Sequence, residues 1–180
     1  TLDVTPPTLI ATSPAADSVS VATASPLRLY FSETVIPAAA NSGVGLVSVL
    51  AYNTTTGECD IPHSSYRANQ FSGASSTTLT VQPVPALASL TRYCVLIAAD
   101  AFTDLAALPY AGISVPATWS FTTRDDVPPA IISLSPAAGA LAVPLATTTF
   151  LMTFDKPVYL STGNILLRTT ADGTIVSTLA

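Results

Sequence analysis

Apolar and polar residues alternate in short runs along most of this 180-residue chain, and such alternation predicts strands rather than helices. In the run 27–31, Leu27, Leu29 and Phe31 alternate with polar positions, so one face would pack on a core and the other would meet water. Clusters of Pro, Gly, Asn and Asp separate the runs and supply turns. Similar runs predict further strands at 9–13, 46–52, 78–81 and 118–122.

Three other segments complete the predicted domain. Residues 93–98 are apolar on both faces, as expected of a central strand that is buried on both sides. Cys59 is expected to open a strand whose partner begins near Tyr66. Residues 100–112 contain only a short run next to proline, which excludes a stable helix. About seven or eight short strands with turns between them predict a Greek-key β-sandwich.

One motif occurs twice in the chain. Residues 3–17 and 125–139 share an Asp, a Pro-Pro pair and a Ser-Pro-Ala-Ala turn, and an alternating strand that ends in Phe and Val follows each copy. A period of roughly 120 residues matches a whole domain and is too long for a solenoid repeat. We therefore expect tandem β-sandwich domains, the first complete over 1–124 and the second represented by its first half over 125–180. Later residues of the same polypeptide, or strands from another chain, would complete the second domain.

Composition narrows the classes of function. Only 9% of the residues are charged, the net charge is −5, and the six Lys and Arg are scattered, so a nucleic-acid partner is not expected. The mean hydropathy is +0.53, yet the apolar residues form short alternating runs that are too brief for a membrane span. Few charges and many hydroxyl groups indicate an extracellular or cell-surface protein.

The two cysteines, Cys59 and Cys94, form no CxxC pair. An even number of cysteines in an extracellular chain predicts a disulfide. Two buried free thiols in a reducing compartment are the alternative.

Several motifs in a fixed order carry a family resemblance. They are the opening motif of 3–17, the strand that ends Phe31-Ser32-Glu33-Thr34-Val35, the run 93–106, and the closing Trp119-Ser120-Phe121-Thr122-Thr123. Together they resemble the bacterial Ig-like domain of surface-layer proteins, over 3–124 and again from 125. The resemblance implies an Ig-like sandwich without catalysis, used as a tandem spacer in adhesins, surface layers and extracellular fibres. Where the family has Gly-Asn after Asp-Leu-Ala, this chain has Ala107-Leu108.

Candidate chemistry is sparse. His63 is the only histidine and has no carboxylate or nucleophile at the spacing of a catalytic triad, so we expect a turn residue and no enzyme. A zinc site would need more His or Cys ligands than the chain has. Asn53-Thr54-Thr55 is an N-glycosylation sequon on a predicted turn. The alternative is an asparagine selected for the turn itself.

Calcium is the one ion that the sequence suggests. Asp125 and Asp126 lie at the predicted domain junction, and Asp104 lies in a loop that would approach a linker. Asp3 has the position of Asp125 in the first copy, and Asp100 is a further acid of the same loop. Carboxylate oxygens from several segments are the ligands that calcium prefers. Solvated linker carboxylates are the alternative, and no other cofactor is expected.

The expected core residues are apolar side chains on the inward faces of the predicted strands. Trp119 alternates with Phe121 on the closing strand, which favours a core position over a sugar-binding surface. The expected core positions are Leu29, Phe31, Trp119, Phe121 and Phe154.

These features predict a non-catalytic structural module of a long extracellular or cell-surface filament, which acts as a rigid spacer and assembly unit. Its partners would be other copies or other subunits of the filament or matrix, and glycans are further candidates. One alternative is an adhesin segment that binds a glycan or a surface protein through loops at one end of a sandwich. A second alternative is an accessory domain of a secreted hydrolase.

Overall fold

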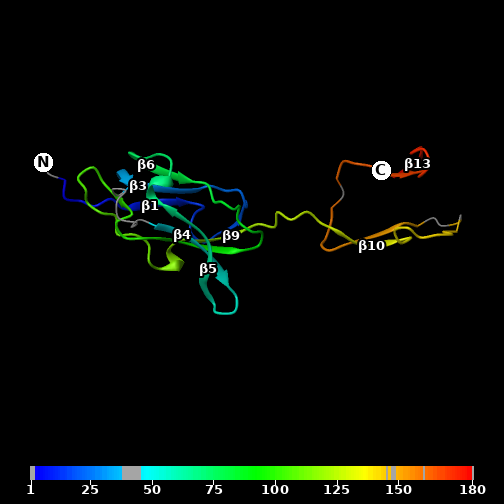
Figure 1. Ribbon diagram of the computed structural model, residues 1–180, viewed down its shortest axis with the longest axis horizontal. Coiled ribbons are helices and arrows are strands. Elements are labelled where there is room, and N and C mark those ends of the chain that lie inside the picture. The colour runs from blue at the N-terminus through cyan, green and yellow to red at the C-terminus, as the bar shows by residue number, and fades with distance from the viewer. Residues whose placement is uncertain (1–2, 38–45, 145, 147–148, 160, 180) are drawn as a thin grey trace. The chain divides into compact units, whose positions relative to one another are not determined.

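The computed structural model describes residues 3–37, 46–144, 146, 149–159 and 161–179. The chain divides into two compact units, Thr1–Val127 and Pro128–Ala180, and each has its own strands (Figure 1). The division falls inside the Asp-Asp-Val-Pro-Pro segment of 125–129, which belongs to the second copy of the motif.

The first unit is a sandwich of two β-sheets. The strands of one sheet run in the order β1-β3-β6, with β8 paired to the far end of β3, and the strands of the other run β2-β9-β7-β4-β5. All pairs are antiparallel except β2 with β9. The predicted all-β, Ig-like sandwich is therefore confirmed for this unit. The strands are β1 (Leu9–Ser13), β2 (Ser18–Val21), β3 (Leu27–Pro37), β4 (Leu46–Asn53), β5 (Glu58–Arg67), β6 (Ser76–Val81), β7 (Arg92–Ile97), β8 (Phe102–Thr103) and β9 (Ser120–Thr123).

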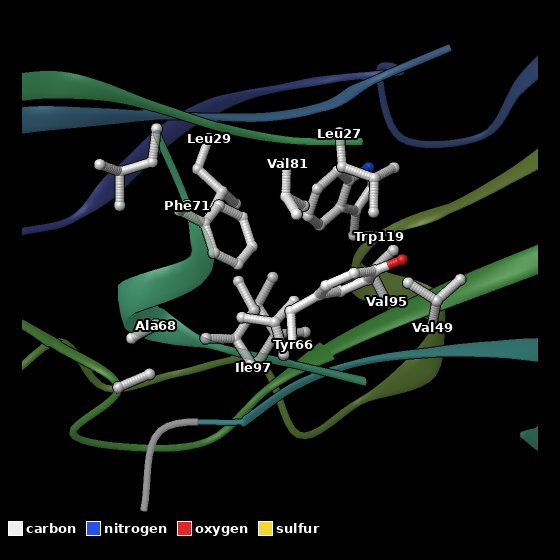
Figure 2. Close-up of a cluster of buried hydrophobic side chains, with 14 of the residues drawn as sticks. Leu27, Leu29, Val49, Tyr66, Ala68, Phe71, Val81, Val95, Ile97 and Trp119 are labelled. Atoms are coloured by element: carbon white, nitrogen blue, oxygen red, sulfur yellow. The ribbon is translucent and has the colours of Figure 1, made fainter. Parts of the chain in front are cut away.

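The core fills the space between the two sheets (Figure 2). Leu27, Leu29 and Phe31 on β3 are buried, as their alternation with polar residues predicts. Trp119 is 1% exposed, and its indole N–H donates to the carbonyl of Pro14 at 2.8 Å. A buried and hydrogen-bonded indole is a core residue, so a sugar-binding role for this tryptophan is excluded. Phe121 is also buried.

Strand β7 is central in its sheet, with β9 on one side and β4 on the other. Its position explains why residues 93–98 are apolar on both faces. Strand β5 forms the edge of the same sheet.

The sequence-based interpretation of 59–66 was wrong, because these residues form one strand, β5, and not a strand with its partner. Along the β4–β5 ladder Val49 pairs with Ser64 and Leu50 with Pro62, so His63 is the extra residue of a bulge. An edge strand tolerates both a proline and a bulge, because one side of its backbone is free of ladder hydrogen bonds. The expectation that His63 lies in a turn was therefore also wrong.

The second unit contains two separate hairpins, β10 (Ile131–Ser135) with β11 (Leu151–Phe154) and β12 (Ile165–Arg168) with β13 (Ile175–Leu179). None of the side chains described in this unit is buried. Phe154, expected in a core, is partly exposed. A two-stranded sheet has too little apolar surface to bury its own side chains.

The repeated motif forms the same antiparallel strand pair in both units, β1 with β3 and β10 with β11. Leu9 pairs with Phe31 in the first, Ile131 pairs with Phe154 in the second, and in both ladders a register shift follows this pair. The next contact is also repeated, because the backbone N–H of Ala130 donates to Asp155 at 2.8 Å, as that of Thr8 donates to Ser32 at 3.0 Å. The sequence repeat is thus a structural repeat over this pair of strands. That the second unit is the first half of another sandwich stays a prediction.

Candidate functional site

Three carboxylates converge beside β3. One oxygen each of Asp3, Glu33 and Asp104 lies within 4.8 Å of the others. Glu33 belongs to β3, and Asp104 directly follows β8, which pairs with the end of β3 through Ile36 and Thr103. Asp3 lies in the segment that leads into β1, and β1 pairs with β3. The pairing of β1 and β8 with one strand therefore brings together acids that are far apart in the sequence.

Asp104 is the most constrained of the three acids. The residue is 1% exposed, and its Oδ1 accepts the backbone N–H of Leu108 at 2.7 Å. Its Oδ2 is buried and has no hydrogen-bond partner among the described residues. A buried carboxylate oxygen without a partner is costly, because it has lost its water and gained no donor.

Glu33 and Asp3 complete the cluster from more exposed positions. The pKa of Glu33 is raised above its ordinary value, first by partial desolvation and then by the negative charges of Asp3 and Asp104. Asp3 is exposed, and one of its carboxylate oxygens accepts the backbone N–H of Thr5 at 3.0 Å. The three negative charges therefore repel one another, and a cation between them would relieve the repulsion.

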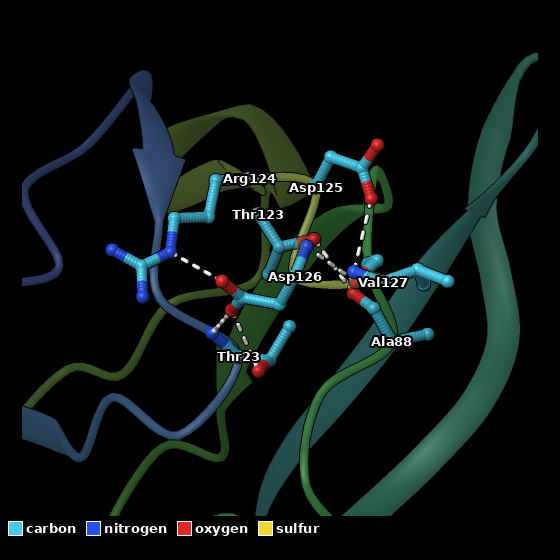
Figure 3. A network of polar contacts seen from close by, with 8 residues as sticks. Thr23, Ala88, Thr123, Arg124, Asp125, Asp126 and Val127 are labelled. Atoms are coloured by element: carbon cyan, nitrogen blue, oxygen red, sulfur yellow. Dashed lines mark hydrogen bonds and ion pairs between the residues drawn. The ribbon is translucent and has the colours of Figure 1, made fainter. Parts of the chain in front are cut away.

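The expected junction site of Asp125, Asp126 and Asp104 is not formed. Asp104 lies with the other two acids of the cluster, while Asp126 accepts hydrogen bonds from the N–H and hydroxyl of Thr23 at 3.0 and 2.8 Å. The guanidinium of Arg124 binds its second oxygen (Figure 3). These contacts lower the pKa of Asp126 to about 2, the backbone N–H of Thr23 having the largest effect. Asp126 is a structural anchor, because its oxygens are already used by protein donors.

The anchor belongs to a larger network where the chain leaves the first unit (Figure 3). The hydroxyl of Thr123 donates to the carbonyl of Ala88 at 2.6 Å, and the backbone N–H of Arg124 donates to Val21 at 2.8 Å. The backbone N–H of Asp126 donates to Ser89 at 3.0 Å. The exit segment is thereby bonded to two neighbouring loops.

Sequence reasoning found Asp3 and Asp104 as candidates but missed Glu33. The sequence held no direct signal for Glu33, because its approach to Asp3 depends on the pairing of β1 with β3, which local alternation does not predict. Asp3 and Glu33 are far apart in the sequence, so their proximity in the fold could not be predicted from it.

Comparisons with known proteins identify a family for the first unit. Residues 3–123 match the family model described as Bacterial Ig-like domain. The chain belongs to this family. A solved structure that resembles the chain is CopC from Methylosinus trichosporium OB3b, with a TM-score of 0.44 and 19% identity over 68% of this chain and 97% of that one. No curated protein matches the chain in sequence.

The predicted disulfide between Cys59 and Cys94 is present in this Ig-like domain, with a Cα–Cα distance of 6.1 Å. It joins edge strand β5 to central strand β7. Disulfides persist in oxidising compartments, so the family and the disulfide together indicate an extracellular or periplasmic protein. Within the described residues, no helix has the length and apolar character that a membrane crossing requires.

Two further candidates lie on the second sheet of the Ig-like domain. Asn53 ends β4, and its side-chain oxygen accepts the backbone N–H of Thr55 at 2.9 Å, which is an Asx turn. Its glycosylation stays a prediction. His63 contacts the hydroxyl of Ser64 at 3.0 Å and packs edge-on against Tyr93, with ring centroids 5.2 Å apart. These contacts place the imidazole in a packing role.

Proposed function

We propose that the chain is a non-catalytic structural module of a long extracellular filament of the surface-layer type. The observation that carries the proposal is the anchored exit of the Ig-like domain, where the second copy of the motif begins. A spacer transmits orientation only if its linkers are fixed to the domains that they join. The bonds from Asp126 to Thr23 and Arg124 provide such an attachment.

The linker contains residues that restrict the backbone. Pro128 and Pro129 restrict their own φ angles and force the preceding residue into extended conformations. Asp125 accepts the N–H of Val127 at 3.0 Å, as Asp3 accepts that of Thr5 in the first copy. The same local turn therefore precedes each Pro-Pro pair, which supports a repeated connection between modules.

The second unit supports an assembly role. Large apolar side chains on all four of its strands are exposed, and a lone hairpin cannot cover them. We propose that further β-strands cover these faces, from the same polypeptide or from another subunit of the filament. The exposed residues are Ile131, Ile132, Leu134, Leu151, Ile165, Leu166, Leu167, Ile175 and Val176.

The adhesin alternative has less support. Binding of glycans by a sandwich end would use exposed aromatic side chains. Every described Phe, Tyr and Trp of the Ig-like domain is buried or half-buried. An accessory domain of a secreted hydrolase would place the catalysis in a separate domain.

The first test concerns the linker. NMR relaxation of the full chain should give backbone order parameters of about 0.85 for residues 124–127, the value of a rigid backbone. Asp126→Ala removes the bonds to Thr23 and Arg124 and should lower these order parameters toward about 0.6. Asp60→Ala is the matched control, because Asp60 lies on β5 outside the exit network. Low order parameters in the unmodified chain would contradict a rigid spacer.

The second test concerns the filament. Antibodies raised against residues 1–127 should label surface filaments at regular intervals in electron micrographs of the producing cells. Label that is found only on soluble protein would contradict the filament.

A further inference from the structure

We propose that Asp3, Glu33 and Asp104 bind one Ca²⁺ ion, which fastens the segment entering the Ig-like domain to β3. The carboxylate oxygens lie within 4.8 Å of one another. Calcium–oxygen bonds are about 2.3–2.6 Å long, so an ion placed between these oxygens lies close to bonding distance from all three, and small rotations of the Asp3 and Glu33 side chains would complete the contacts.

The buried oxygen of Asp104 distinguishes this cluster from an ordinary solvated acidic patch. Oδ1 is satisfied by Leu108, but Oδ2 has no partner in the described part of the chain. The loop that carries it is fixed by a second bond, from the backbone N–H of Asp104 to the carbonyl of Leu108 at 3.1 Å. A carboxylate oriented by its own loop, with one buried oxygen left over, is a preformed cation ligand.

The ligand types select the ion. All three donors are carboxylate oxygens, which favour hard cations over zinc or copper. The only histidine lies on β5, in the other sheet, and both cysteines are in the disulfide. The acids come from three separate segments, one of them exposed, and calcium tolerates such irregular geometry better than magnesium does. Waters would complete the coordination.

The second copy of the motif provides a natural comparison. Phe31 pairs with Leu9 on β1 as Phe154 pairs with Ile131 on β10. Two residues further along each chain segment, Lys156 therefore has the position of Glu33. In the second copy the lysine supplies a positive charge at the place where, in the first copy, the ion would supply it. The site is therefore specific to the first copy, and Glu33→Lys gives the first copy the residue that the second copy has at this position. Calcium binding does not depend on the chain being part of a filament.

The experiment is thermal unfolding of the full chain, first with chelator and then with calcium chloride up to about 10 mM, which covers the affinities of extracellular calcium modules. Calcium at about 100 times Kd should raise the Tm by roughly 5–10 °C. Isothermal titration with calcium chloride should give one site. Magnesium chloride at the same concentration should give a smaller shift.

Three variants make the test specific. Glu33→Gln should weaken calcium binding at least tenfold, and Glu33→Lys should abolish the Tm shift. Asp104→Asn should also abolish it, and Glu33 provides the independent test if that buried substitution prevents folding. Asp60→Asn, which removes a carboxylate outside the cluster, should keep the full shift. No shift at about 10 mM calcium, or the same shift in the Glu33 variants as in the unmodified chain, would overturn the site.

Discussion

Ala107 adopts a backbone conformation that suits glycine. Its φ is +66°, in the left-handed region, where a Cβ costs about 1 kcal/mol. Ala107→Gly should therefore stabilise the Ig-like domain by about 0.5–1 kcal/mol, as measured by urea unfolding. Ala106→Gly is the matched control, because Ala106 is not among the residues with positive φ. It should be neutral or destabilising, and equal effects of the two would contradict the argument.

Asp126 makes stability depend on pH in the acid range. Its pKa falls from 3.8 to about 2 on folding, because Thr23 and Arg124 bind the ionised form. A lowered pKa contributes stability above the unfolded value and loses it as the pH falls through the folded value. The difference in unfolding free energy between the unmodified chain and Asp126→Asn should therefore shrink between about pH 4 and pH 2. Urea titrations across this range measure it, and a constant difference would contradict it.

At the residue scale, sequence reasoning succeeded for side chains whose burial depends only on which face of a strand they occupy. Trp119 directly precedes β9 and Phe121 lies on it, and the two alternate with Ser120 and Thr122, so their burial follows from the pattern. Glu33 was missed because its role depends on pairing with segments far away in sequence. Asp126 was assigned to a metal because sequence gives charge but not the donors that neutralise it.

At the scale of elements, the disulfide is a covalent constraint on the second sheet, between β5 and β7. It closes a loop across a sequence separation of 35 residues, which corresponds to about 3–4 kcal/mol in the chain-entropy model. The double variant Cys59→Ala/Cys94→Ala should lose about this much unfolding free energy in urea. Reduction of the unmodified chain should give a similar loss. A loss below about 1 kcal/mol would show that the constraint contributes little.

Most strands of the Ig-like domain follow from local alternation, and β5 shows the limit of that reasoning. Cys59 was expected to open a strand whose partner begins near Tyr66, but one strand, β5, continues through 62–63 because an edge position accommodates a bulge. Whether a strand lies at an edge is decided by the whole sheet. Local sequence contains only part of that information.

At the scale of the whole molecule, the two units differ in how far they can support themselves. The first has a core of buried residues from both sheets and a disulfide. The second consists of two hairpins whose described side chains are all at least partly exposed. The sequence repeat predicted a second β-unit that begins with the same pair of strands, because the motif contains the residues of that pair. A core also requires a facing sheet, and the motif does not contain one.

This contrast predicts the order of proteolysis. A protease requires local unfolding, which costs little where few apolar contacts are buried. Limited digestion of the full chain should therefore cleave within 128–180 first and leave a resistant fragment that ends near residue 127, identified by mass spectrometry. The Tm of that fragment should match the main transition of the full chain, because the core and the disulfide lie within it. A resistant fragment from 128–180, or equal loss of both units, would show that the second unit has a stability of its own.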